Sequence, residues 1–167
     1  MNGPSALAAH TAVEGAFVLG AFNHFATVVG GPQASPRAGE HGVAIGRFAW
    51  MGVDGLTLNM RSSDADLQGV VITVANPGVD WRWVFYDDAT RTYRIRQGLP
   101  CPMLSRGNVW VRFQYGARPG EQVYANILDG SAISGYSAGG ELTPWVVVTH
   151  AAAGGLSIIS TQRGQLQ

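Results

Sequence analysis

The sequence has no lysine, a single cysteine and no net charge. All 11 basic side chains are arginine, and 11 acidic side chains balance them, so no overall field would attract nucleic acid. The lone Cys101 excludes an internal disulfide and any zinc site built from cysteines. Protein interfaces are rich in arginine and poor in lysine, so the arginine-only composition favours a surface that a partner covers, or it reflects a GC-rich genome.

The sequence also lacks a clean hydrophobic run of the length that a membrane helix needs. The longest candidate spans residues 12–29, but Glu14 and Asn23 interrupt it, and its glycines would loosen a helix. No basic residue precedes Arg37, so the positive start of a secretory signal is missing. We therefore expect neither a membrane segment nor a signal peptide.

Glycine and proline, by contrast, are spread along the whole chain, with 23 and 8 copies. Both residues weaken helix interiors, and here they separate short apolar runs, which favours many short strands. The length of 167 residues suits one domain with a sizeable core. We predict an all-β fold, a β-sandwich or jelly roll over residues 37–167, preceded by an apolar N-terminal arm and linker over residues 1–36.

The clearest predicted strand covers residues 107–115. Its side chains alternate with a period of two, which places one face in a core. The apolar face comprises Val109, Val111, Phe113 and Tyr115. Pro119 and Gly120 then predict a turn, and we expect a return strand through Val123 to pair with the first strand as a hairpin.

Other apolar runs predict further strands, each bounded by turn residues. A second hairpin is expected from residues 80–86 and 90–96, which flank Asp87, Asp88 and Ala89. Residues 135–144 are small and polar, and they predict a long loop. The remaining predicted strands are residues 42–50, 56–60, 67–74, 145–150 and 155–160.

Aromatic residues of the second hairpin alternate with arginines. Trp81, Trp83 and Phe85 share one face and Tyr86 lies on the other. Such a surface would stack on single-stranded nucleic acid, but the neutral chain favours core packing plus a protein interface. The candidate interface residues are Phe17, Phe22, Phe25, Trp81, Trp83 and Tyr86.

One segment of the sequence matches an enzyme motif. Residues 135–139 match the G-x-S-x-G elbow of hydrolases, with Ser137 as nucleophile, and Glu141 and His150 follow in the required order. The motif needs a helix directly after the serine, and Gly140, Thr143 and Pro144 oppose one. We predict that the chain is not an enzyme.

Metal and cofactor sites are not predicted either. His10, His24, His41 and His150 lack the spacing of metal ligands on one helix or strand. Asp64 and Asp66 begin like a calcium loop, but the required glycine and closing glutamate are absent. No cofactor is expected.

Several segments together resemble the structural cement proteins of tailed phages, a family of capsid decoration proteins. The resemblance extends from about residue 12 to residue 160, in the order and spacing of strand and turn patterns. Its segments are residues 12–15, 42–50, 107–111, 120–125 and 129–132. The resemblance implies a jelly-roll-like fold, a homo-oligomer with a dimer favoured over a trimer, and no catalytic residues.

The same resemblance implies a partner and a place. The partner would be the major capsid protein, whose subunits the oligomer bridges on the outer face of the virion shell after synthesis in the host cytoplasm. Nucleic acid and membrane are not expected as partners. The alternative is a carbohydrate-binding or host-attachment β-sandwich, because exposed tryptophan and tyrosine also stack on sugar rings.

Overall fold

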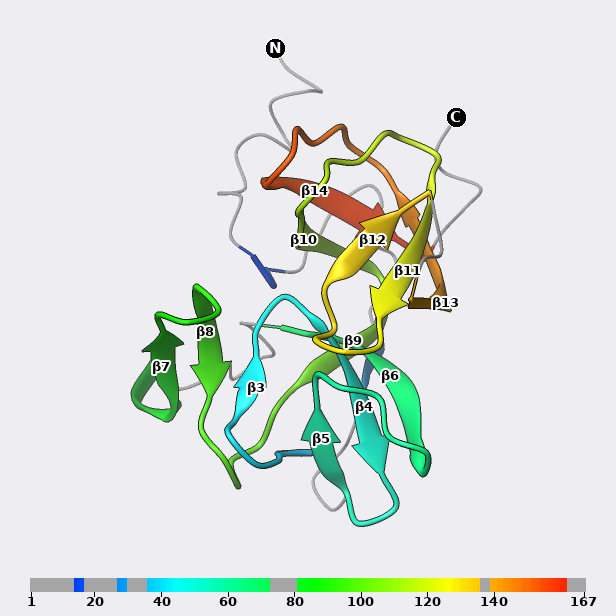
Figure 1. The fold of residues 1–167 in the computed structure, drawn as a ribbon. Coiled ribbons are helices and arrows are strands. Elements are labelled where there is room, and N and C mark those ends of the chain that lie inside the picture. The colour runs from blue at the N-terminus through cyan, green and yellow to red at the C-terminus, as the bar shows by residue number, and fades with distance from the viewer. Residues whose placement is uncertain (1–13, 17–26, 30–35, 73–80, 136–138, 162–167) are drawn as a thin grey trace.

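The computed structural model describes residues 14–16, 27–29, 36–72, 81–135 and 139–161. Within these residues the chain is all-β, as predicted: it has no α-helix and a single 3-10 turn, η1 (Trp81–Trp83). The strands form a six-stranded sheet, a closed five-stranded barrel and a three-stranded sheet (Figure 1). The barrel lies above the six-stranded sheet in this view, and the three-stranded sheet lies to its side.

The six-stranded sheet lies between the other two units. Its strands, in spatial order, are β1 (Thr27–Val29), β9 (Met103–Arg106), β6 (Ala65–Val71), β4 (Phe48–Gly52), β5 (Leu56–Leu58) and β2 (Arg37–Ala38). Neighbouring strands are antiparallel except β5 and β2. A tight turn joins β4 to β5, with Gly55 at a φ of 80° and its N–H bonded to the carbonyl of Gly52 at 3.0 Å.

The barrel uses the C-terminal third of the chain. Its strands, in order around the barrel, are β10 (Asn108–Phe113), β12 (Ala132–Ser134), β11 (Gln122–Asn126), β13 (Gly140–Val147) and β14 (Gly155–Ser160). Strand β10 pairs with β14 along its whole length in antiparallel orientation, whereas it pairs with β12 only at Phe113 and Ala132. Closure of the barrel removes free strand edges from this part of the molecule.

The three-stranded sheet contains β3 (Val43–Ala44), β8 (Thr92–Ile95) and β7 (Val84–Asp87), in that order. Strands β7 and β8 form the predicted second hairpin, with Tyr86 opposite Tyr93. The expected strand over residues 80–86 is shorter than predicted, because Trp81–Trp83 form the 3-10 turn η1 instead.

Adjacent residues of the six-stranded sheet belong to two different hydrophobic cores. Phe48 and Trp50 pack with barrel residues, whereas Ala49 between them packs toward the three-stranded sheet. In the same way Val70 faces the barrel and Val71 faces the other core. The period of two along a strand thus places the sheet as a middle layer with both faces buried.

The central predicted hairpin is wrong in its pairing. The alternation over β10 is confirmed, because Val109, Val111 and Phe113 are all buried. However, β10 pairs with β14 and β12, and the strand through Val123 pairs with β12 and β13. Tyr115 is exposed, since β10 ends at Phe113 and the chain then bends away.

Two further predictions needed correction. The expected loop over residues 135–144 is strand from Gly140 onward, and Pro144 is tolerated there because the register between β11 and β13 shifts beside it. The expected strand over residues 42–50 is two strands, β3 and β4, because Gly46 breaks it with a φ of 83°.

Two short pieces of the N-terminal segment are attached to the body of the protein. Gly15 donates a backbone hydrogen bond to the carbonyl of Trp110 at 2.8 Å, and the Trp110 N–H donates to Ala16 at 3.0 Å. Strand β1 pairs with β9 at the edge of the six-stranded sheet. The predicted boundary between arm and domain at residue 36 stays a prediction.

Candidate protein-binding surfaces

The hairpin of β7 and β8 presents a pair of aromatic side chains to solvent. Tyr86 and Tyr93 lie opposite each other, with ring centroids 5.1 Å apart and an angle of 62° between the rings. They are 48% and 54% exposed, although they pack against each other. On the opposite face of the hairpin, the guanidinium of Arg96 lies over the ring of Phe85, 5.3 Å from its centroid. We call η1, β7 and β8 (residues 81–96) the arginine-aromatic hairpin.

A network of hydrogen bonds fixes the turn of this hairpin. The Asp87 carboxylate accepts hydrogen bonds from the Thr90 hydroxyl at 2.9 Å and the Ala89 N–H at 3.0 Å. These bonds, the one from Thr90 above all, lower the pKa of Asp87, and Arg94 acts in the same direction. Arg94 also donates to the carbonyls of His41 and Gly42, at 3.2 and 3.0 Å, which ties the hairpin to the turn before β3.

Only part of the predicted interface can be placed in the structure. Tyr86 is exposed, as an interface residue would be, and Trp83 is half-buried. Phe17, Phe22 and Phe25 lie outside the described residues, as does the side chain of Trp81. The structure adds Tyr93, which the sequence pattern showed only as one more aromatic of the second strand, as the partner of Tyr86.

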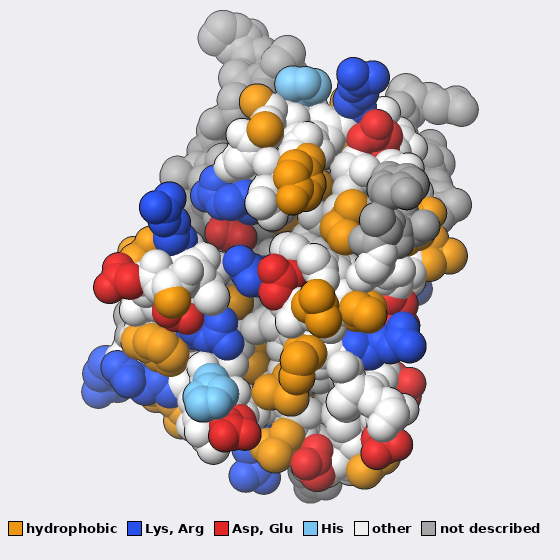
Figure 2. Space-filling model, in the orientation of Figure 1, with side chains coloured by type: hydrophobic (Ala, Val, Ile, Leu, Met, Phe, Trp, Pro, Cys, Tyr) orange, Lys and Arg blue, Asp and Glu red, His pale blue; other side chains and the backbone are white. Residues whose placement is uncertain are grey.

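A second surface lies at the β4–β5 turn. Val53, in this turn, is 96% exposed, and Leu56 and Met60 are 44% and 50% exposed. They line a hollow of about 370 Å³ together with the carboxylates of Glu40, Asp54 and Asp64. Figure 2 shows acidic and hydrophobic side chains intermixed over this lower end of the molecule. We call it the acidic apolar hollow.

The sequence contained a signal for this hollow. Val53 is a hydrophobic residue inside a tight turn, where the side chain points to solvent whatever its chemistry. The other apolar members, Leu56 and Met60, come from a short strand and its end, and periodicity does not show that they gather with Val53.

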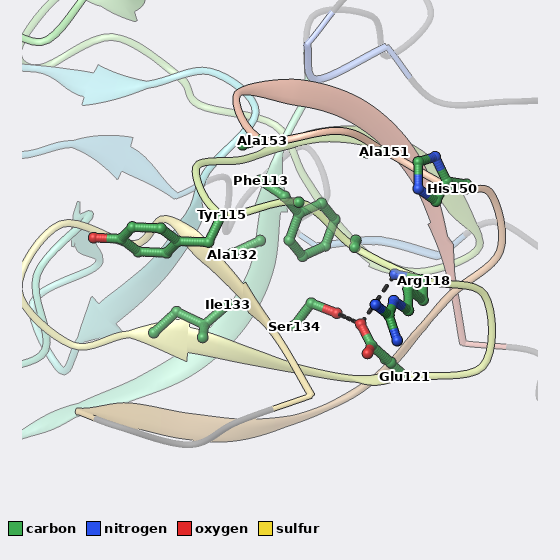
Figure 3. Close-up of a pocket in the computed structure, with 12 residues that line it drawn as sticks. Phe113, Tyr115, Arg118, Glu121, Ala132, Ile133, Ser134, His150, Ala151 and Ala153 are labelled. Carbon is green, nitrogen blue, oxygen red and sulfur yellow. Dashed lines mark hydrogen bonds between the residues drawn. The ribbon is translucent and has the colours of Figure 1, made fainter.

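A third surface lies at one end of the barrel (Figure 3). It is a hollow of about 570 Å³ between Phe113 and Tyr115 on one strand end and Ile133 and His150 on others. Glu121 accepts hydrogen bonds from the Ser134 hydroxyl and from the backbone N–H of Arg118. These bonds lower the pKa of Glu121 and hold its carboxylate in place as part of the barrel wall.

The N-terminal attachment forms a fourth, charged surface. Glu14 lies 3.5 Å from the Arg112 guanidinium, and Arg47 lies 3.6 Å from Asp129, in one hollow of about 620 Å³. Burial raises the pKa of Glu14, and the two arginines oppose that rise. Both ion pairs are internal to the chain and secure residue 14, and Tyr86 and Arg91 of the arginine-aromatic hairpin line the same hollow.

Comparison with known proteins identifies the family. The family model described as "Structural cement protein (E217 gp24/Pam3 gp6)" matches residues 8–162. The chain belongs to this phage cement protein family. The comparison with curated proteins gave no match.

A solved structure with the same fold supports the assignment. It is a chain in "The capsid of Myoviridae Phage XM1", with a TM-score of 0.54 and 18% sequence identity. The match covers 90% of the present chain and 94% of the other chain. The likeness shows the fold, and the family model shows a structural role in the phage capsid.

The hydrolase motif does not have the elbow context in this cement protein. Ser137 lies outside the described residues, but the chain after it forms strand β13, where an elbow requires a helix. Glu141 accepts a hydrogen bond from the Trp50 indole at 2.7 Å and lies 3.9 Å from Arg61. His150 lies at the barrel hollow instead (Figure 3). The family is described as structural, which agrees with the absence of an elbow around Ser137 in the described residues.

The described residues contain no group of three or more histidine, cysteine or acidic side chains that would hold a metal ion. Burial raises the pKa of the Cys101 thiol to about 11, so this thiol is a buried, unreactive part of the core. In the part of the chain that the structure describes, no helix has the length and apolarity to cross a membrane.

Proposed function

We propose that the chain decorates the outer surface of a phage capsid as a homo-oligomer and bridges subunits of the major capsid protein. The observation that carries the proposal is the match of the cement family over residues 8–162. The exposed aromatic and apolar surfaces support it, because clustered hydrophobic side chains in contact with water mark interaction sites.

The physical mechanism follows from where such a protein binds. Contacts that span a joint between capsid subunits exist only in the closed shell, so their binding free energy opposes separation of the subunits. A single contact need not be large, because an oligomer that grips two subunits at once converts the second binding event into an intramolecular one. The compact all-β body would act as a rigid spacer between the contacts with the two capsid subunits.

The N-terminal segment is the proposed contact with the shell. Phe17, Phe22 and Phe25 give it the apolar character of a segment that is covered in the assembly. The residues on both sides of them, 14–16 and 27–29, are hydrogen-bonded to the body of the protein. Any contact that the phenylalanines make with the shell is therefore made by a segment that is anchored to the body on both sides.

Co-sedimentation with capsid shells tests the proposal. Purified protein is mixed with shells depleted of it, the copies bound per shell are counted, and shell melting is followed. We expect saturable binding at a number that the shell symmetry allows, together with a raised melting temperature of the shell. Absence of binding to mature shells would reject the proposal.

The exposed pair Tyr86 and Tyr93 favours one alternative function, a carbohydrate-binding or host-attachment module, because aromatic rings stack on sugar rings. A glycan screen separates the two functions. A specific glycan that the wild type binds and that Trp81→Ala or Trp83→Ala loses would favour the alternative. For a cement protein we expect no specific glycan.

A further inference from the structure

We propose that the arginine-aromatic hairpin of one copy docks into the acidic apolar hollow of a second copy of the chain. The proposal rests on the homo-oligomer in the proposed function and names the two surfaces that build it. A twofold dimer would make this contact twice, and a ring would make it once per neighbour.

The donor surface has the composition of an interface centre. The face of the hairpin that carries the exposed pair Tyr86 and Tyr93 adjoins Arg91, with which Tyr86 lines one hollow. Arg94 and Arg96 lie on the opposite face, with Phe85. Arginine and tyrosine are among the side chains that most often dominate binding energy at interfaces. Figure 2 shows the basic side chains around the hairpin, at the left of the molecule.

One positive charge of this surface, that of Arg91, is available for binding. Among the described residues the exposed Arg91 side chain has no ion pair and no hydrogen bond, and Asp87 is already occupied by Thr90 and Arg94. The turn is preorganised by those same bonds, so docking orders few additional groups.

The acceptor surface is complementary in both charge and polarity. The described residues that line the hollow include three carboxylates and no basic side chain. Asp64 is exposed and has no described partner, while Val53, Leu56 and Met60 supply apolar contact. The hollow of about 370 Å³ has room for protruding side chains of a partner.

The same chain thus carries two opposite surfaces, and each offers what the other lacks. Opposite potentials across an interface steer association and fix its register, whereas like charges across it are strongly unfavourable. None of the hairpin residues 81–96 is among the described residues that line the hollow, so one copy does not occupy its own hollow. We therefore assign the hollow to the hairpin of a second copy.

Charge reversal tests the contact in the free protein, without shells. Arg91→Glu and Asp64→Arg are each expected to weaken self-association about tenfold or more, measured by analytical ultracentrifugation at low salt. The double variant restores opposite charges across the contact, and we expect its dissociation constant to return to within about threefold of wild type. The matched control is Arg118→Glu, an exposed arginine at the barrel hollow, which should leave self-association unchanged.

The outcomes separate this proposal from the proposed function. A monomeric wild type, single reversals without effect, or a double variant that stays weak would each overturn the docking. If Asp64→Arg weakened shell binding but left self-association intact, the hollow would receive the capsid protein instead, and the docking would be wrong while the cement function stood. Melting temperatures of all variants, expected to match wild type, exclude misfolding as the cause.

Discussion

The two faces of the six-stranded sheet are covered in different ways. The face toward the barrel carries Phe48, Trp50 and Leu104, and it shares one large core with all five barrel strands. The opposite face carries Ala49, Val71 and Met103, and it is covered by the short strands of the three-stranded sheet. A closed barrel has no free strand edge that could move independently. The three-stranded sheet is open, and its strands are only two to four residues long.

This difference separates stability from binding within one domain. The barrel side supplies most of the large buried side chains, Trp145 and Phe113 among them. The other side supplies the exposed arginine-aromatic hairpin, held by Arg94 and by a smaller core. We therefore expect mutations on the barrel side to unfold the protein and mutations on the hairpin side to act locally.

The largest effect is expected at Trp50. Its indole is buried between sheet and barrel and donates to Glu141, so Trp50→Ala leaves a cavity and removes one hydrogen bond from the Glu141 carboxylate. We expect a loss of about 3–5 kcal/mol in the free energy of unfolding, measured by urea denaturation. Tyr115→Ala, at an exposed position, serves as the control and should stay within about 0.5 kcal/mol of wild type. A loss below about 1 kcal/mol at Trp50 would break the comparison.

The adjacent pair Val70 and Val71 sharpens the comparison, since both side chains are fully buried but on opposite faces. We expect Val70→Ala to cost roughly 2–3 kcal/mol and Val71→Ala roughly 1–2 kcal/mol, because the three-stranded sheet collapses onto a cavity more readily than a closed barrel. The same denaturation experiment measures both. Equal costs would show that the barrel and the three-stranded sheet are equally rigid, and the reverse order would show that the barrel is the less rigid of the two.

A smaller, local effect is expected at Arg94. Arg94→Met keeps the apolar stem but removes the hydrogen bonds to the carbonyls of His41 and Gly42. We expect about 1–2 kcal/mol less stability and faster amide exchange in β7 and β8, with barrel amides unchanged. Exchange that accelerated equally in the barrel would mean that hairpin and barrel open as one unit.

The smallest effect concerns pH. Because the pKa of Glu14 is raised above its usual 4.5 on folding, the folded chain holds this proton more tightly than the unfolded chain. The Glu14 contribution to stability is therefore highest below pH 4.5 and falls as pH rises toward the folded pKa.

Glu14→Gln should remove that fall. The difference in unfolding free energy between wild type and variant, followed from pH 4 to pH 7, isolates it. Asp87 and Glu121, with lowered pKa values, gain stability as pH rises, but they are present in both proteins and cancel. A difference that rose with pH would mean that the ion pair with Arg112 outweighs burial.

Sequence reasoning succeeded where the signal is local. The all-β class, the buried parity of Val109 and Val111, and the β7–β8 hairpin around Asp87 all follow from alternation and turn residues within a few positions. It failed where the partner of a strand lies far along the chain. The pairing of β10 with β14 and the strand through Pro144 depend on barrel closure, which no local pattern encodes.

The candidate surfaces show the same limit. Tyr86 was predicted from its place among aromatics, but its exposure depends on the hairpin projecting from the body. The acidic apolar hollow was missed, because Glu40, Val53 and Asp64 come together only when β2, β4, β5 and β6 are assembled into one sheet.

The backbone hydrogen bonds between Gly15 and Trp110 have a consequence for synthesis of the chain. Residues that leave the ribosome early find their partner in the first barrel strand, made much later. The loop that this contact closes is long, and long-range contacts of this kind form slowly. Residues 14–16 therefore cannot make these hydrogen bonds until β10 has been synthesised.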